Sequence, residues 1–306
     1  MPLYILKRLL AAIPTLFIVV TLSFFMMRLA PGGPFDLERP LDPIVMANLR
    51  RIYQLDQPVH VQFGTYLWSL LHGDLGPSFY WRDFTVNELF AKALPISIRL
   101  GAGALALAIL AGGTLGALAA SRQNKAGDYA VMALATLGVT IPNFVVAPVL
   151  QLVFGLALAW LPIGGWDGGS WRNVLLPTLA LALPQIAVVA RLTRASMIEM
   201  LRSNPIRTLR ANGLPARVVY LHALRGAILP AVSYLGPAAA GLMTGSIIVE
   251  NIFAIPGVGR YFIEGALSRD YTLVMGTVVL IAVMVIVLNL VVDLLYALID
   301  PRVRYE

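Results

Sequence analysis

The sequence predicts an all-α protein that crosses a membrane six times. Of its 306 residues, 58% are hydrophobic and only 13% are charged, and the mean hydropathy is +0.79. The apolar residues stand in long unbroken runs, and about 20 consecutive apolar residues let a helix span the hydrocarbon core of a bilayer. Helices are the expected spanning element because they satisfy their own backbone hydrogen bonds in lipid. The candidate runs cover roughly 9–29, 96–120, 129–160, 174–190, 227–249 and 273–298.

The first apolar run is expected to be a retained span. Lys7 and Arg8 precede it, as basic residues precede the apolar core of a signal peptide. The run is longer than a typical signal core, however, and the stretch "RLAPGGPFD" after it offers no small-x-small cleavage site. We therefore assign residues 1–30 to the N-terminus and the first transmembrane helix, with a cleaved signal peptide as the lesser alternative.

The net charge of +7 is explained better by membrane orientation than by nucleic-acid binding. If the N-terminus is cytoplasmic, six spans return the C-terminus to the cytoplasm. The segments on that side then hold many more Lys and Arg than Asp and Glu, which is the positive-inside bias of short loops. We expect a multi-pass protein with both termini in the cytoplasm.

The segment from 31 to 95, between the first two spans, is too long for a simple turn. Asp42 and Pro43 are expected to begin one short helix. Pro58 is expected to begin a second, which ends near Gly73. We predict a small helical cap on the outer surface, with an inert folded loop as the alternative. Aromatic residues suited to a membrane–water interface stand nearby, namely Trp68, Phe79, Tyr80 and Trp81.

Prolines and glycines mark the spans. A proline in a spanning helix removes a backbone hydrogen bond and bends the axis, although such helices tolerate it. Two pairs of small residues, Gly112–Gly116 and Gly241–Gly245, would let helices approach closely, either within this chain or between subunits. The prolines interrupt the third and fourth runs: Pro142, Pro148, Pro177 and Pro184.

The chain carries few groups suited to catalysis or metal binding. No G-x-x-x-x-G-K-[ST] phosphate loop occurs, and the absence of cysteine excludes thiolate chemistry. His60, His72 and His222 are not paired at metal-ligand spacing. We therefore predict no catalytic, cofactor or metal site. Asp293 is the most deeply placed acid of a span, and a position near the cytoplasmic end favours an ion pair or cap over a transport role.

The stretch "SNPIRTLRANGLPARVVYLHALRGAILP", residues 203–230, is the unusual segment of this apolar chain. Asn204 is expected to cap a short helix with Pro205 at its first position. About two turns follow, and Gly213 offers a left-handed stop. A short helix of this kind, lying across the membrane, would fit a groove on a soluble partner.

In that arrangement Ile206 and Leu209 would supply apolar area to the partner. Arg207 and Arg210 would supply orientation and charged hydrogen bonds. Two alternatives remain at this point. The segment can be a basic loop that only obeys the positive-inside bias, or it can be a polybasic lipid-binding site.

The same segment resembles the cytoplasmic loop of bacterial ABC-importer permeases of the oligopeptide and dipeptide family. Gly213 matches the hallmark glycine of that loop, and Leu229 with Pro230 matches its trailing leucine-proline. Where the general importer pattern has an acidic residue and two alanines, this chain has "RTL" at 207–209. The version R-T-x-R-A-x-G-L is typical of the peptide branch. Other stretches are similar to the same family: "FFMMRLAPGGPF", "HGDLGPSF", "ENIFAIPGVGR", "SRDYTLVMG" and "IDPRVRY".

The likeness is closest to the first, or B-type, of the two membrane subunits of oligopeptide permeases. It implies a type I importer core of five spans over 96–306, with a coupling loop at 203–225. It also implies a permease subunit of the bacterial inner membrane that passes oligopeptides from periplasm to cytoplasm. The implied partners are a homologous second permease, two ATP-binding subunits and a periplasmic peptide-binding protein. ATP and Mg²⁺ would be held by the ATP-binding subunits, so this chain would need no cofactor and would not be an enzyme.

The resemblance assigns the coupling role to a set of residues in the loop. Substrate-binding residues cannot be assigned from the sequence. A permease for dipeptides or another small ligand is the nearest alternative. An ATP-independent secondary carrier and a membrane scaffold or sensor are the alternatives from other classes. The expected coupling residues are Asn204, Ile206, Arg207, Thr208, Leu209, Arg210, Gly213 and Leu214.

Overall fold

The described part of the chain is helical apart from turns and one isolated β-bridge between Pro77 and Thr85. In residues 2–5 and 295–299 the helix is described by its backbone only. The computed structural model describes residues 2–29, 46–48, 51, 54–81, 83–243 and 247–299.

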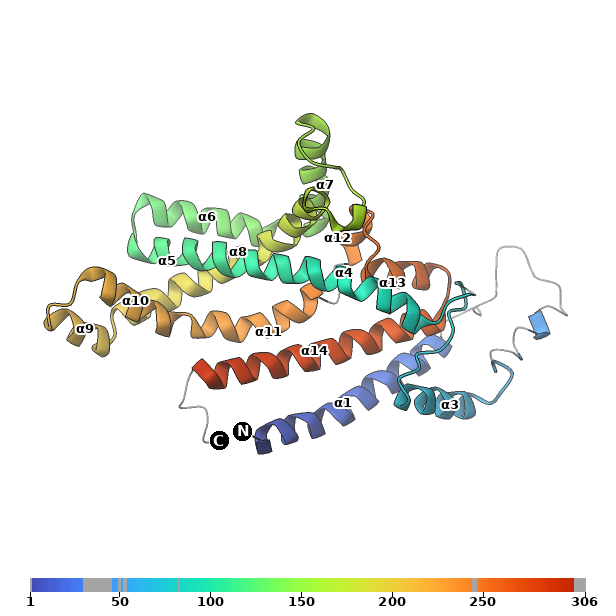
Figure 1. Ribbon diagram of the computed structural model, residues 1–306. Coiled ribbons are helices and arrows are strands. Elements are labelled where there is room, and N and C mark those ends of the chain that lie inside the picture. Colours follow the sequence, from blue (N-terminus) through green and yellow to red (C-terminus); the bar gives the residue numbers. More distant parts are fainter. Residues whose placement is uncertain are drawn as a thin grey trace.

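Five helical stretches are long and apolar enough to cross a membrane, and a bent pair raises the number to six if it forms one span. They lie in a bundle with their axes roughly aligned (Figure 1). Five of the six predicted runs therefore coincide with single candidate spans, and the third coincides with the bent pair. The five are α1 (Pro2–Leu29), α4 (Val86–Leu107) continued through η1 (Ala108–Gly112) into α5 (Gly113–Ser121), α8 (Trp171–Leu201), α11 (Leu229–Met243) with α12 (Ile247–Ile252), and α14 (Tyr271–Ile299).

The bent pair consists of α6 (Ala126–Thr140) and α7 (Asn143–Leu150), which continues into a π-helical turn, η2 (Gln151–Ala157). The two helix axes meet at 104°, and α7 leaves the bundle (Figure 1). Pro142 lacks an N–H and disfavours helical geometry in Ile141, whose backbone is extended. This is the one predicted proline interruption that breaks a helix. The other three prolines, Pro148, Pro177 and Pro184, lie inside α7 or α8.

Helix α8 lies at the centre of the bundle and contacts α4, α5, α6 and α11. Two glycines allow the close approach of α5. A Cβ on Gly112 would lie 2.7 Å from the carbonyl oxygen of Ile186, and one on Gly116 would lie 2.4 Å from that of Ala190. The first small-residue pair therefore packs within this chain. At Gly241, from the second pair, an added Cβ would meet no atom of the described chain within 4 Å.

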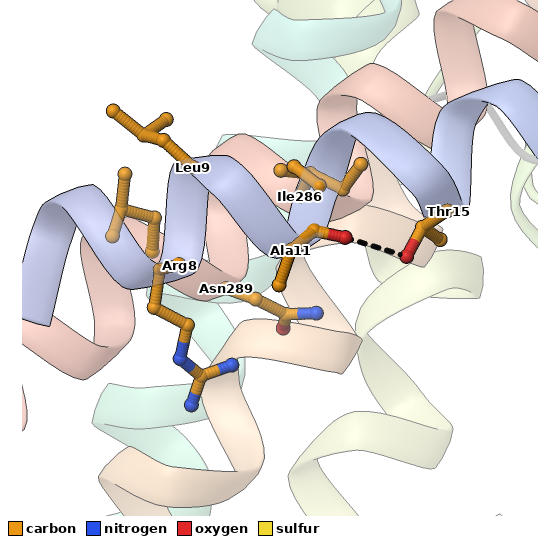
Figure 2. A pocket seen from close by; sticks show the side chains of 8 residues that line it. Arg8, Leu9, Ala11, Thr15, Ile286 and Asn289 are labelled. Atoms are coloured by element: carbon orange, nitrogen blue, oxygen red, sulfur yellow. Dashed lines mark hydrogen bonds between the residues drawn. The ribbon is translucent and has the colours of Figure 1, made fainter.

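Helix α1 packs along α14. Arg8 Nη2 lies 3.0 Å from Asp293 Oδ2, so the deepest acid of the last span forms an ion pair, which confirms the ion-pair interpretation. Beside it, a small hollow of about 150 Å³ is lined by Arg8, Thr15 and Asn289 among others (Figure 2). Helix α1 begins and α14 ends at the end of the bundle that also carries α9 (Asn204–Ala211) and α10 (Ala216–Ala227), which we call the α9 end (Figure 1).

The opposite end carries α3 (Val59–Leu71) and α13 (Val258–Leu267), and we call it the α13 end (Figure 1). The predicted helix after Pro58 is confirmed, with Pro58 as its N-cap and Gly73 beyond its end at φ +74°. Phe63 of α3 packs against Phe24 of α1, with ring centroids 5.1 Å apart. Burial in this contact raises the pKa of Tyr66 to about 12. The predicted start at Asp42 and Pro43 lies outside the described residues.

Candidate functional site at the α9 end

Helix α9 begins one residue earlier than the sequence predicts. Ser203 is the N-cap, in an extended conformation, and Asn204 is the first helical residue rather than the cap. Pro205 therefore takes the second position, where its missing N–H is still harmless because the first turn has no intrahelical acceptor. Within the described chain, Ser203 Oγ has no hydrogen-bond partner. The helix start thus depends on backbone geometry and proline, and the predicted Asn204 cap is wrong.

The end of α9 is a left-handed glycine stop, as predicted. Gly213 has φ +73°, its N–H donates to the Arg210 carbonyl at 3.0 Å, and the Leu214 N–H donates to the Leu209 carbonyl at 3.3 Å. This pair of bonds is a Schellman motif. A Cβ on Gly213 would have no described neighbour within 4 Å. Glycine is therefore required here by backbone conformation and not by crowding.

The apolar face of α9 is used by the chain itself. Ile206 is only 2% exposed and packs against Met197 of α8 and Val219 and Ala223 of α10. Leu209 is half-buried against the same cluster. The prediction that Ile206 offers apolar area to a partner is therefore wrong, because α9 folds back on its own neighbours.

What α9 presents outward is polar and basic. Arg207, Thr208 and Arg210 are exposed, as is Asn204 at the start of the helix. Leu214, just after the glycine stop, is 38% exposed and is the apolar part of this surface. Six of the eight predicted coupling residues thus lie on or beside one accessible surface, whereas Ile206 lies beneath it and Leu209 is half-buried.

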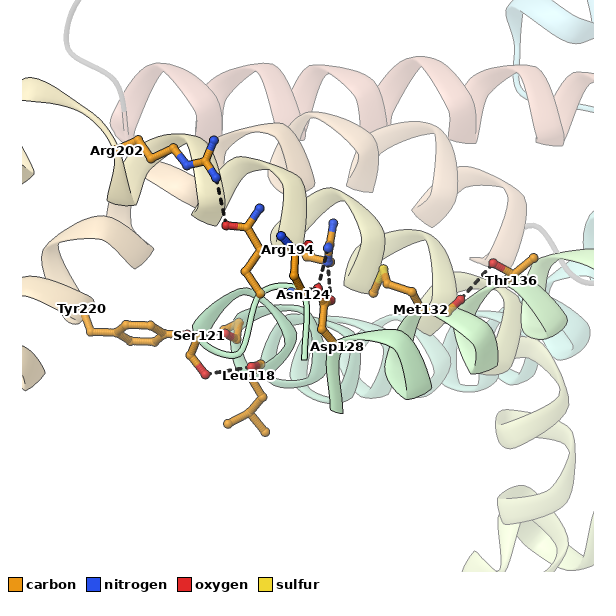
Figure 3. Close-up of polar contacts among 11 residues, drawn as sticks. Leu118, Ser121, Asn124, Asp128, Met132, Thr136, Arg194, Arg202 and Tyr220 are labelled. Carbon is orange, nitrogen blue, oxygen red and sulfur yellow. Dashed lines mark hydrogen bonds and ion pairs between the residues drawn. The ribbon is translucent and has the colours of Figure 1, made fainter. Parts of the chain in front are cut away.

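Polar contacts join α8 and α10, against which α9 packs, to α5, α6 and the turn between them (Figure 3). Arg194 of α8 binds Asp128 of α6 through two hydrogen bonds, of 2.5 and 2.6 Å, and Asp128 is only 1% exposed. Arg202 donates to Gln123 at 3.0 Å, and the Tyr220 hydroxyl donates to the Ala117 carbonyl. Of these three links, Arg202–Gln123 joins the α8–α10 turn to the α5–α6 turn, and the other two join α8 to α6 and α10 to α5.

A groove of about 450 Å³ opens between these two turns. Arg210 is the charged residue of its lining, and burial raises the pKa of Tyr220, also in the lining, above its ordinary value. A side chain from another protein can enter this groove and meet both an apolar floor and a guanidinium group. The lining consists of Ala120, Ser121, Leu201, Arg210, Leu214, Ala216, Val219 and Tyr220.

Sequence reasoning missed the Asp128–Arg194 pair and Tyr220. In the sequence, Asp128 and Arg194 contributed only to the charge count of the segments assigned to the cytoplasm, and nothing indicated that they form a pair. The usable signal was an acidic residue at the start of an apolar run, in a part of the chain where basic residues dominate. Tyr220 gave no signal, because its partner is a backbone carbonyl about a hundred residues away.

At the α13 end, a buried carboxylate fixes the "HGDLGPSF" stretch. Asp270 has no exposed surface. Its Oδ2 accepts hydrogen bonds from the Ser78 hydroxyl at 2.5 Å, the Phe79 N–H at 2.9 Å and the Tyr80 N–H at 3.1 Å. Its Oδ1 accepts from Thr272 and from the backbone at the start of α14. The stretch is thereby fixed to the start of the last span.

A second buried carboxylate explains the "ENIFAIPGVGR" stretch. Glu250 accepts hydrogen bonds from the Ser97 hydroxyl at 2.7 Å and the Gly259 N–H at 2.8 Å, at the start of α13. A Cβ on Gly257 would lie 2.3 Å from the Glu250 carboxylate, and one on Gly259 would lie 2.9 Å from it. The glycines of this stretch therefore make room for the carboxylate. In the described residues no cluster of three or more metal-ligating side chains is found.

Comparison with known proteins adds an independent finding. The family described as "Binding-protein-dependent transport system inner membrane component" matches residues 112–305. The chain is 53% identical over 303 residues to the "Oligopeptide transport system permease protein OppB" of Salmonella typhimurium, covering 99% of both chains. The Escherichia coli K12 protein of that name gives the same values. It is 42% identical over 302 residues to the "Dipeptide transport system permease protein DppB" of Bacillus subtilis, covering 98% of this chain and 97% of the other.

Proposed function

Because the chain belongs to the family of binding-protein-dependent transport system inner membrane components, we propose that it is the membrane-spanning permease subunit of an ATP-driven oligopeptide importer. The observation that carries this conclusion is the 53% identity to oligopeptide permease proteins over 99% of both chains. The fold agrees, since several helices long and apolar enough to cross a membrane pack together as a bundle. The chain is a transport component and not an enzyme.

The α9 end is the cytoplasmic side, and the membrane is the bacterial inner membrane. The exposed arginines of this end support the orientation, because short loops on the cytoplasmic side are rich in Lys and Arg. Helix α1 begins and α14 ends here (Figure 1), so both termini are cytoplasmic. The basic residues of the α8–α10 turn are Arg202, Arg207, Arg210, Arg217 and Arg225.

The outward face of α9 is the contact for an ATP-binding subunit. Arg207 and Arg210 stand on it as charged donors, and the groove beside it accepts an apolar side chain next to Arg210. The other partners are a homologous second permease, a second ATP-binding subunit and a periplasmic peptide-binding protein. ATP and Mg²⁺ are held by the ATP-binding subunits. Helix α3, which precedes the span that begins at Val86, belongs to a helical cap on the periplasmic side.

Transport follows from movement of α9 with its ATP-binding subunit. Ile206 seats α9 on α8 and α10, and the Asp128–Arg194 pair carries the displacement to α6. ATP binding outside this chain then opens the pathway toward the periplasm. A ligand shifts a two-state equilibrium from 1:99 to 99:1 only if its affinities for the two states differ by about 5.5 kcal/mol. The contacts that couple α9 to the spanning helices, at Ile206 and at the Asp128–Arg194 pair, must therefore be rigid.

Reconstitution of the full complex into vesicles tests this function. Labelled oligopeptide should enter only when ATP and the binding protein are both present, and a dipeptide should compete poorly. Efficient dipeptide uptake would favour the alternative suggested by the likeness to the dipeptide permease. Uptake by this chain alone without ATP would establish a secondary carrier instead. Co-purification with partners but no peptide-dependent ATPase activity would indicate a scaffold or sensor.

A further inference from the structure

A second groove, of about 380 Å³, opens on the wall of the bundle where α7, α8 and α11 meet. It is distinct from the groove at the α9 end and from both carboxylate sites at the α13 end. Three of its lining residues carry polar side chains, and none of its lining residues is charged. The lining consists of Asn143, Leu181, Gln185, Tyr234, Pro237, Ala238, Gly241 and Leu242.

The polar residues of this groove lie within spanning helices. Gln185 stands 14 residues after the first residue of α8, Trp171, and 16 before its last, Leu201, so it is at the middle of the helix. Tyr234 lies inside α11, and Asn143 is the first residue of α7 after the bend. Polar groups in hydrocarbon without partners are unfavourable by several kcal/mol. The groove is therefore unsuited to face lipid and instead faces water or protein.

The hydrogen-bonding groups of the groove are only partly used. The Tyr234 hydroxyl donates to Gln185 Oε1 at 2.5 Å, and no described residue accepts a hydrogen bond from the two amide N–H groups of Gln185. Asn143 Oδ1 is buried and has no partner among the described residues. The groove thus offers the Gln185 amide as a donor and the Tyr234 hydroxyl oxygen, which can still accept, beside it.

We propose that this groove binds the main chain of the transported peptide and forms this subunit's wall of the pathway, an inference that rests on the proposed function. A peptide group presents one N–H and one C=O, and neutral amide and carbonyl groups complement both. A wall without charge does not select among peptide side chains by charge. Gly241 has no side chain and Pro237 has a short one, so these two lining residues leave room in the groove for an extended peptide.

Single cysteines test the position of the groove, because the chain has no native cysteine. Gly241→Cys adds a thiol where nothing described lies within 4 Å, and Gly113→Cys adds one at a helical position outside the groove that likewise has no described atom within 4 Å. In the reconstituted complex, a membrane-impermeant thiol reagent should modify the first variant. Tri-alanine delivered with the binding protein should slow that reaction and leave the reaction at position 113 unchanged. Equal protection at both positions, or protection at neither, overturns the proposal.

Two further variants separate peptide binding from packing. Gln185→Leu removes the free amide at similar volume, and Tyr234→Phe removes only a hydroxyl that already bonds within the chain. Loss of one hydrogen bond corresponds to about a fivefold change in affinity. Gln185→Leu should raise the KM for peptide uptake about fivefold with unchanged assembly, and Tyr234→Phe should change it less.

The two proposals fail in different ways. If the wild-type complex imports tri-alanine with ATP but Gln185→Leu has the wild-type KM, the groove assignment is wrong and the permease function stands. If the wild-type complex imports no peptide and no peptide protects Cys at 241, both are wrong.

Discussion

Replacing Gly213 by valine should uncouple ATP hydrolysis from peptide binding. Gly213 has φ +73° and closes the Schellman motif that ends α9. An L residue with a Cβ in this region is unfavourable by about 1–2 kcal/mol, and a β-branched residue is more strained still. Since no described atom lies within 4 Å of the new Cβ, the whole effect comes from the backbone. Alanine should therefore be mildly harmful and valine severely so.

Asparagine is the matched control at the same position, because it tolerates the left-handed region. The assay is peptide-stimulated ATPase activity of the reconstituted complex, with membrane insertion measured in parallel. We expect normal insertion for all variants, activity close to wild type for Gly213→Asn and loss of stimulation for Gly213→Val. Normal stimulation in the valine variant would refute the coupling role, and equal loss in both would refute the backbone explanation.

Three further predictions test the contacts around the two ends. Ile206→Ala should leave a cavity beneath α9 and lower the free energy of unfolding by about 2–4 kcal/mol. Thermal unfolding in detergent measures this change. An unchanged unfolding midpoint would show that Ile206 does not hold α9 against α8 and α10. Asp128→Asn should lower the free energy of unfolding by about 2–3 kcal/mol, which is less than for a fully buried ion pair because the Arg194 side chain is 25% exposed. Adding Arg194→Gln to this variant should recover part of the lost stability. If the two substitutions instead lower the stability additively, the pairing is contradicted. Gly259→Ala would place a Cβ 2.7 Å from the Ile247 Cα and should abolish peptide uptake by the reconstituted complex. Gly64→Ala, where an added Cβ meets no described atom within 4 Å, should leave uptake unchanged. Equal uptake by the two variants would contradict the close packing at Gly259.

Much of the fold follows from one physical requirement, that backbone in lipid must be helical. The apolar runs therefore located the spans, and Gly213 located the end of α9, because a left-handed residue favours glycine locally. Proline was less informative. Pro142 breaks its helix, yet Pro177 and Pro184 lie inside the continuous α8, because neighbouring helices hold the axis together.

The remainder depended on contacts between distant segments. Nothing in "SNPIRTLRANG" shows that Ile206 faces its own α8 and α10, because an amphipathic helix can bury its apolar side within or outside the chain. Asp270 and Glu250 read as ordinary acids in the sequence. Only the fold brings Ser78 and Ser97 to them, across 192 and 153 residues.

The most direct test of the central claim, that a separate ATP-binding subunit contacts the outward face of α9, is a cross-linking measurement in the native complex. Thr208→Cys places a thiol on that face, and Leu71→Cys places one at the opposite end, where Leu71 is 81% exposed. A short thiol-to-amine cross-linker should join the Thr208→Cys chain to an ATP-binding subunit and should fail to do so for Leu71→Cys. If Thr208→Cys cross-links to no ATP-binding subunit, or if both variants cross-link equally, the claim is wrong.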